Sequence, residues 1–152
     1  MQDVTLRNSA YWTQDYEKCN GVIVRGVKVY SHANWNNDGL DIDSRNVVVS
    51  DCYIDCDDDA LCLKSDTDTP CENVTVTNCV LKSNCNAIKF GTSSYSGFKN
   101  VTISNCTIDR ASEDHIRQWY KNYPWIGTKH KTVVAGIALE SVAVSYTHLR
   151  AH

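Results

Sequence analysis

Three stretches of the chain repeat one phrase: NVVVSDCYI at residues 46–54, NVTVTNCVL at residues 73–81 and NVTISNCTI at residues 100–108. Each copy starts 27 residues after the one before it, and a weaker copy, GVIVRGVKV, occupies residues 21–29. A sequence period between about 20 and 50 residues indicates a repeat architecture. The repeat therefore constrains the fold class more strongly than any single residue does.

A second short apolar segment follows each copy of the phrase. These segments cover residues 39–43, 60–64, 87–91 and 136–140. Each repeat thus holds two or three strands of roughly five residues, separated by polar turns and rich in β-branched residues. Such units are too short for propeller blades and lack the helix of a leucine-rich repeat. We predict an all-β fold, a parallel β-helix (solenoid) in which each repeat is one coil.

Equivalent residues of neighbouring coils are expected to stack, because adjacent coils of a β-helix lie about 4.8 Å apart. Cysteines that recur at one position of the repeat are better explained as small apolar packing residues than as disulfides or metal ligands. We expect a hydrogen-bonded ladder of Asn46, Asn73 and Asn100, and an interior stack of Cys52, Cys79 and Cys106.

Two segments depart from the repeat. Residues 1–143 are expected to form a partial β-helix domain, with an inserted loop at about residues 112–131. We expect the solenoid to be truncated at both ends, because uncapped terminal coils expose unpaired backbone and apolar surface. Residues 144–152 match no repeat and resemble a non-native tail.

Composition excludes several function classes. The 152 residues carry 15 basic and 18 acidic side chains, a net charge of −3 without a basic run, which argues against a nucleic-acid surface. No apolar stretch is long enough to span a membrane. The first residues lack the plan of a signal peptide.

Two acidic turns, NNDGLDIDS at residues 36–44 and DDDALCLKS at residues 57–65, align with each other. Strand alternation then puts their leucine and isoleucine side chains inward. We expect Asp38 and Asp59 to face solvent as a vertical pair, with Asp58 beside them. Two stacked carboxylates repel each other, which raises the pKa of one and suits general acid–base catalysis.

Two other interpretations of the acidic turns stay open at this point. The turns are merely solvated, or the acidic run at residues 55–59 binds Ca²⁺, which prefers hard oxygen ligands. A cysteine zinc site is disfavoured because the chain has no Cys-x-x-Cys pair.

The motif Asn36-Asn37-Asp38-Gly39, followed 20 residues later by Asp58-Asp59-Ala60, resembles the polygalacturonase family, glycoside hydrolase family 28. The Asn-Val-x-Ile-x-Asn-Cys phrases are also typical of that family, and the resemblance covers roughly residues 2–142. It implies a right-handed parallel β-helix that hydrolyses pectic polysaccharides with inversion. It further implies that Asp58 is the general acid and that Asp38 and Asp59 hold and activate the water.

The sequence departs from the family pattern at the positions that hold the substrate. Asn86 occupies the position of the family's Gly-His-Gly histidine, and residues 138–140 (ALE) replace its Arg-Ile-Lys motif. We expect Lys89 to replace part of the missing charge and contact a substrate carboxylate, or else to pair with Asp41 or Asp38. These departures favour a branched pectin such as rhamnogalacturonan, or exo-action on oligosaccharides, over plain homogalacturonan.

Aromatic residues in the inserted loop are candidates for a sugar-stacking platform, the alternative being that they pack the loop onto the solenoid. The expected substrate-binding residues are Asn36, Lys64, Asn86, Lys89, Trp119 and Trp125.

The leading functional hypothesis is a glycoside hydrolase that acts on pectic polysaccharide or oligosaccharide as a monomer, without cofactor or metal. Two alternatives are a Ca²⁺-dependent polysaccharide lyase and a non-catalytic β-helix module for carbohydrate binding or adhesion. A further alternative is that the fragment is inactive by itself, because missing coils supply part of the cleft. The substrate class implies an extracellular or periplasmic location, with no nucleic-acid or membrane partner.

Overall fold

The computed structural model describes residues 1–113 and 135–141, and these form an all-β solenoid of about four turns. The strands are β1 (Thr5–Arg7), β2 (Asp15–Arg25), β3 (Lys28–Ser31), β4 (Leu40–Ser50), β5 (Tyr53–Cys56), β6 (Leu61–Ser65), β7 (Cys71–Thr77), β8 (Val80–Ser83), β9 (Asn86–Ser94), β10 (Phe98–Ser104), β11 (Thr107–Arg110) and β12 (Ala135–Leu139). The described residues contain no helix, and hence none long and apolar enough to cross a membrane.

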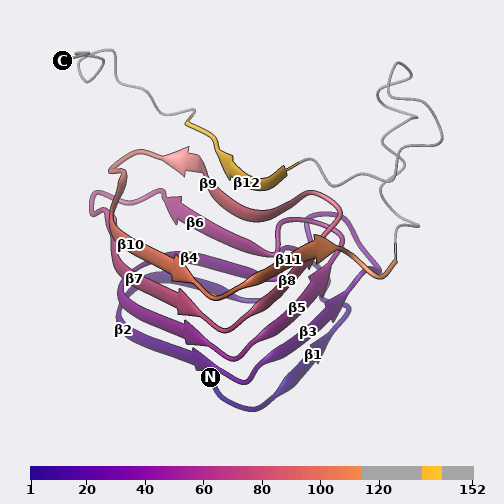
Figure 1. The fold of residues 1–152 in the computed structure, drawn as a ribbon. Coiled ribbons are helices and arrows are strands. Elements are labelled where there is room, and N and C mark those ends of the chain that lie inside the picture. The colour runs from indigo at the N-terminus through magenta and orange to yellow at the C-terminus, as the bar shows by residue number, and fades with distance from the viewer. Residues whose placement is uncertain (114–134, 142–152) are drawn as a thin grey trace.

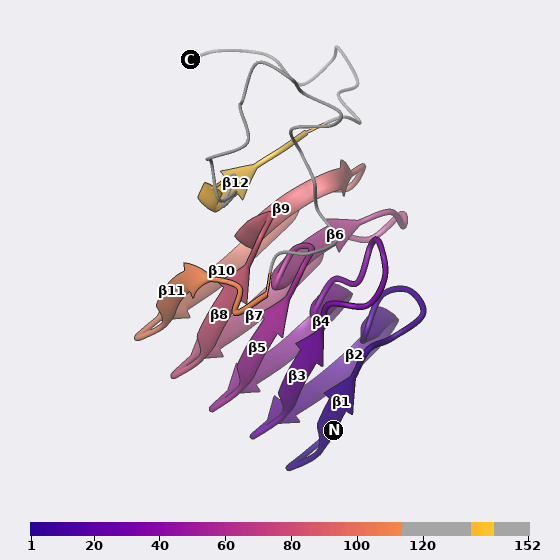
Figure 2. The same ribbon diagram turned by 90° about the vertical axis from the view of Figure 1, so that its right-hand side faces the viewer.

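All pairings between these strands are parallel, which confirms the predicted β-helix (Figures 1 and 2). One sheet has the order β1-β3-β5-β8-β11, and a second sheet runs β10-β7-β4-β6-β9-β12 with β2 beside β4. β4 pairs with β6 through residues 40–42 and with β7 through residues 45–50, so the second sheet divides into two faces.

We name three faces accordingly. Face 1 contains β6, β9, β12 and the first halves of β2 and β4; face 2 contains β7, β10 and the second halves of β2 and β4; face 3 is the five-stranded sheet. The chain passes from face 1 to face 2 to face 3 in every coil. Each turn type therefore recurs at the same corner of the stack.

The asparagine ladder lies in β2, β4, β7 and β10, and it is confirmed. Asn73 Nδ2 donates to Asn46 Oδ1 at 2.9 Å, and Asn100 Nδ2 donates to Asn73 Oδ1 at 3.0 Å. Asn46 in turn donates to Asn20 at 2.7 Å, so the ladder extends one coil further than predicted. Asn46, Asn73 and Asn100 have φ between 53° and 56°, a left-handed conformation that asparagine tolerates better than most residues.

The cysteine stack is confirmed as packing. Cys52 and Cys79 are buried and Cys106 is partly exposed, while all eight cysteines are free thiols. Each thiol of the stack donates at 3.2 Å to the carbonyl two residues earlier, which satisfies its only polar group. The thiols adjoin a core of valine, leucine and isoleucine side chains, each of which stabilises the fold by about 1.5–3 kcal/mol when fully buried.

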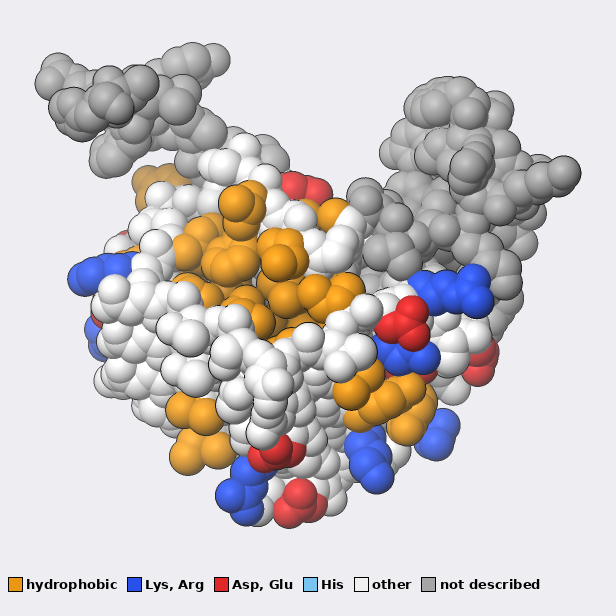
Figure 3. All heavy atoms as spheres, in the orientation of Figure 1, with side chains coloured by type: hydrophobic (Ala, Val, Ile, Leu, Met, Phe, Trp, Pro, Cys, Tyr) orange, Lys and Arg blue, Asp and Glu red, His pale blue; other side chains and the backbone are white. Residues whose placement is uncertain are grey.

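Two apolar side chains of β12 align with core positions of β9 but are exposed. Ile137 aligns with Ile88 and Leu139 with Phe90, yet Ile137 and Leu139 are exposed because β12 is the last described strand of its face. Figure 3 shows hydrophobic side chains gathered between β9, β10 and β11 at this end of the stack. Most of the predicted loop at 112–131 and the whole tail at 144–152 lie outside the described residues.

Candidate active site

The candidate site lies at the corner where the chain passes from face 3 to face 1. Gly39 N donates to Asp59 O at 2.8 Å, and Ala60 N donates to Asn86 O at 2.9 Å, so Asp38, Asp59 and Asn86 occupy equivalent positions on successive coils. Glycine is required at residue 39, because a Cβ there would lie 2.2 Å from Ile54 Cγ2. The register predicted from the acidic turns is therefore correct.

The expectation that Asp38 and Asp59 face solvent is wrong. Asp38 is 6 % exposed, Asp59 2 % and Asp58 7 %, and the neighbouring Asp41 is fully buried. Side chains of adjacent coils fold against these carboxylates, which the alternation of apolar residues alone did not indicate. We call Asp38, Asp41, Asp58 and Asp59 the acid cluster.

Asp59 is held by three donors from the next coil. Its Oδ1 accepts from the backbone N of Asn86 at 3.0 Å and from Asn86 Nδ2 at 2.7 Å, and its Oδ2 pairs with Lys89 Nζ at 3.1 Å. Lys89 also pairs with Glu140 Oε2 at 3.3 Å. The alternative that Lys89 pairs with Asp41 or Asp38 is thus wrong, because its ammonium lies between Asp59 and Glu140.

Asp58 is oriented by its own turn and by the coil before it. Its Oδ1 accepts from Asp59 N at 2.9 Å, and its backbone N donates to Asn37 Oδ1 at 2.9 Å. Asn37 is fully buried, whereas Asn36 is exposed. Within the Asn-Asn-Asp motif, therefore, the second asparagine contacts the turn of the acid cluster.

Buried Asp41 forms an ion pair with partly exposed Lys64, whose Nζ lies 3.1 Å from Asp41 Oδ2. The same ammonium lies 3.7 Å from the centroid of the Trp12 ring, a cation–π contact. Trp12 belongs to the turn between β1 and β2, so residues from three coils meet here. Nothing in the repeat pattern pointed to Trp12, which stands outside both acidic motifs.

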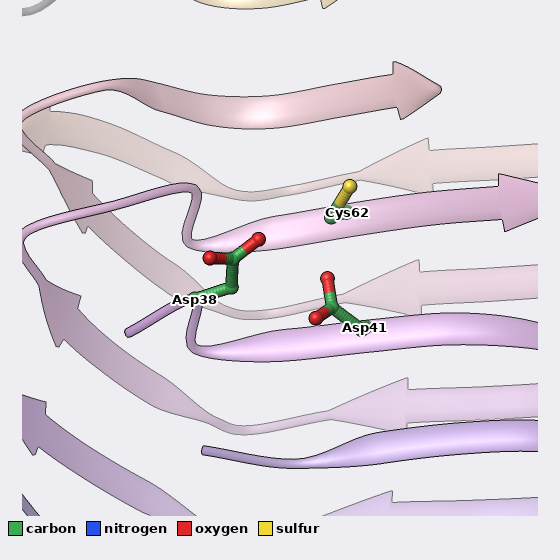
Figure 4. A group of neighbouring side chains, drawn as sticks. All are labelled: Asp38, Asp41 and Cys62. Carbon is green, nitrogen blue, oxygen red and sulfur yellow. The ribbon is translucent and has the colours of Figure 1, made fainter. Parts of the chain in front are cut away.

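Burial and mutual repulsion raise two carboxyl pKa values in the acid cluster. Burial, followed by the charge of Asp59, raises the pKa of Asp38 to about 6, as the predicted stacking requires. Burial, followed by the charge of Asp38, raises the pKa of Asp41 to about 8. Figure 4 shows Asp38 and Asp41 on one coil, with Cys62 on the neighbouring strand β6. The cluster therefore holds protons at a pH where ordinary carboxyls are ionised.

The acidic run at residues 55–59 does not converge on one point. Asp55 Oδ1 lies 3.1 Å from His32 Nε2 and accepts from Ser112 N at 3.0 Å, while Asp57 Oδ1 accepts from Asn84 Nδ2 at 2.9 Å. These contacts direct Asp55 and Asp57 away from the acid cluster, and they argue against the run acting as one Ca²⁺ loop.

Two groups of side chains bring three possible metal-ligand atoms within 4.8 Å of one another. They are Asp38, Asp41 and Cys62, and Asp58, Asp59 and Cys85. In each group a lysine already neutralises one carboxylate, Lys64 at Asp41 and Lys89 at Asp59. Burial raises the pKa of both thiols well above the ordinary value, so thiolate ligands are costly to form.

Comparison with known families agrees with this geometry. The family model described as Glycosyl hydrolases family 28 matches residues 1–145. The chain belongs to this family. Family 28 enzymes are glycoside hydrolases of pectic polysaccharides, so a polysaccharide is the substrate class of the chain. Comparisons with curated proteins and with solved structures returned no match.

Most of the residues predicted for the site of this family 28 chain lie together. The predicted residues that meet at the corner between face 3 and face 1, directly or through one partner, are Asp38, Asp58, Asp59, Lys64, Asn86 and Lys89. Trp119 and Trp125 lie outside the described residues, and no contact joins exposed Asn36 to the cluster among those described. Sequence reasoning missed Asn37, Asp41 and Trp12 as members of the site.

Proposed function

We propose that the acid cluster hydrolyses glycosidic bonds in a pectic polysaccharide of galacturonan or rhamnogalacturonan type, with inversion at the anomeric carbon. One observation carries the proposal. Asp38, Asp58 and Asp59 are buried together on two successive coils, yet each is held in a different electrostatic environment. Carboxyl groups in different environments are able to take the acid and base roles that inverting hydrolysis needs.

The roles follow from the contacts. Asp58 is the general acid: it protonates the leaving glycosidic oxygen, and the hydrogen bond from Asp59 N fixes the orientation of its side chain. Asp38 and Asp59 hold the attacking water and accept its proton. The pKa of Asp38, about 6, keeps this carboxyl ionised from mildly acidic pH upward and still basic enough to accept a proton.

The lysines serve both the acids and the substrate. Lys89 fixes the side chain of Asp59, because its ammonium lies 3.1 Å from Asp59 Oδ2. Lys64 and Lys89 are both partly exposed, so we assign their side chains to the polar groups of the sugar, while the buried Asn86 orients Asp59. The two ammonium groups take the place of the cations missing from residues 138–140. A cell-wall polymer as substrate also implies that the enzyme works outside the cytoplasm.

The test is an assay of the purified protein on polygalacturonate and on rhamnogalacturonan, with reducing ends measured at several pH values. We expect hydrolysis of at least one polymer and a loss of about 10³-fold or more in Asp58→Asn, in keeping with the size of acid catalysis. The matched control is Asp68→Asn, which alters an exposed aspartate outside the cluster. An unsaturated product that absorbs in the ultraviolet, or activity that a chelator abolishes, would instead identify a lyase.

A further inference from the structure

We propose that Trp12, with Tyr11 beside it, forms a sugar-stacking subsite on the β1–β2 side of the acid cluster. The indole ring stacks on a pyranose unit of the bound chain, next to the unit that is cleaved. The inference rests on the proposed function, and it adds a binding residue from a coil that carries none of the acidic motifs.

The position of Trp12 is fixed against the coil that carries Asp38. Thr13 N donates to Asp38 O at 2.8 Å, and Gln14 Nε2 donates to Gly39 O at 3.2 Å. Asp15 aligns with Asp41, so Trp12 occupies the position of Asp38 on the preceding coil. A ligand that extends from Asp38 along the solenoid toward β1 passes this turn.

The two aromatic rings are exposed, although their turn is hydrogen-bonded to the coil that carries Asp38. Trp12 is 38 % exposed and Tyr11 52 %, and their ring centroids lie 4.8 Å apart. The turn is braced from within, because Ser9 Oγ lies 2.9 Å from Thr13 Oγ1 and 3.0 Å from Ser31 Oγ. Because hydrogen bonds already order this turn, the two exposed aromatic side chains lose little conformational entropy when a ligand binds.

Lys64 fixes the orientation of the indole ring and connects it with the acid cluster. Its ammonium lies 3.7 Å from the ring centroid of Trp12 and 3.1 Å from Asp41 Oδ2. Although this ammonium lies over the ring, Trp12 is still partly exposed to solvent. The ring is thus held in place before the ligand arrives, and the ligand does not have to order it.

The chemistry of the rings identifies the ligand class. Aromatic rings bind the apolar C–H faces of pyranoses through dispersion and burial of apolar area, and neither depends on a charge on the sugar. The subsite therefore accepts a uronate and its methyl ester equally well. This behaviour distinguishes it from any contact made by Lys64 or Lys89, which favours the charged form.

Binding is measured by calorimetric titration of oligogalacturonides, in acid and in methyl-esterified form, into the protein carrying Asp58→Asn to prevent turnover. Trp12→Ala is expected to weaken binding of both forms by about five- to tenfold, and Trp12→Phe by less than about twofold. Trp12→Leu keeps a large apolar side chain without the aromatic ring, and it should lose as much affinity as Trp12→Ala. If Trp12→Ala does not fold, Trp12→Leu tests the proposal in its place. The matched control is Tyr95→Ala, an exposed aromatic residue beyond the other end of face 1, which should bind like the parent.

The inference is overturned if Trp12→Ala and Trp12→Leu bind both ligands like the parent. It is equally overturned if Tyr95→Ala weakens binding as much, or if the loss is confined to the acidic form. This titration does not require catalysis. A protein that binds through Trp12 but hydrolyses neither polymer would refute the proposed function alone.

Discussion

Asp38 is expected to destabilise the folded protein above mildly acidic pH, so Asp38→Asn should stabilise it there. A carboxyl with a pKa of 3.8 in the unfolded chain and about 6 when folded binds its proton more tightly in the folded state. The stability that this carboxyl contributes is complete below pH 3.8 and is lost as the pH rises through 6. At 1.36 kcal/mol per pH unit, the loss above pH 7 is about 3 kcal/mol.

Asparagine has the shape of the protonated carboxyl but does not ionise, so it removes this loss. Thermal unfolding followed by circular dichroism should show Asp38→Asn melting about 6–12 °C above the parent at pH 7.5, since about 1 kcal/mol corresponds to 2–4 °C in a chain of this size. At pH 4 the difference should fall to about 0.5 kcal/mol, or one or two degrees. Asp68→Asn, at an exposed aspartate, should change neither value. Equal melting temperatures for Asp38→Asn and parent at pH 7.5 would refute the argument that Asp38 is strained by burial and by Asp59.

Three further predictions concern catalysis and the ladder. The pH profile of kcat/KM should have an acidic limb that rises with an apparent pKa near 6, where Asp38 ionises. Lys64→Gln should move this limb to higher pH, because Lys64 lowers the pKa of Asp38. A limb that stays in place would exclude Asp38 as the base. Lys89→Gln should lower kcat by about 10–100-fold, because it removes the cation that pairs with Asp59. Lys99→Gln, at an exposed ion pair on face 2, should leave kcat unchanged. Equal kcat values for Lys89→Gln and the parent would mean that Asp59 needs no cation. Asn73→Ala should destabilise the fold by about 2–4 kcal/mol in urea unfolding, because it loses the ladder hydrogen bonds and places alanine in a left-handed backbone conformation. Asn73→Gly should cost about half as much, because glycine tolerates the positive φ. Equal losses would assign the whole effect to the ladder hydrogen bonds.

The repeat phrase made most of the fold predictable. Spacing alone aligned Asn46 with Asn73 and Cys52 with Cys79, because parallel coils with one period force equivalent residues into columns. A second polar ladder at the corner between face 2 and face 3 was not foreseen. There Asn78 donates to Asp51 at 3.4 Å, and Asn105 donates to Asn78.

The site was predictable in register but not in environment. The strand register aligns Asp41, Cys62 and Lys89 in one column outside the apolar positions, but alternation alone treats every such position as solvent-exposed. Burial of Asp41 depends on where the long side chain of Lys64 lies, and a local pattern does not fix that. The cation–π contact of Trp12 joins the turn before β2 to strand β6, which are far apart in sequence and share no motif, so only the folded structure reveals it.

The most direct test of the central claim is the anomeric configuration of the first product. Proton NMR of a reducing-end signal, recorded within minutes of adding enzyme to an α-linked pectic oligosaccharide, should show the β-anomer before mutarotation produces the α-anomer. This result requires a water held by Asp38 and Asp59 to attack opposite the bond that Asp58 protonates. An α-anomer as the first product would instead require a covalent intermediate, and it would contradict the roles assigned to the acid cluster.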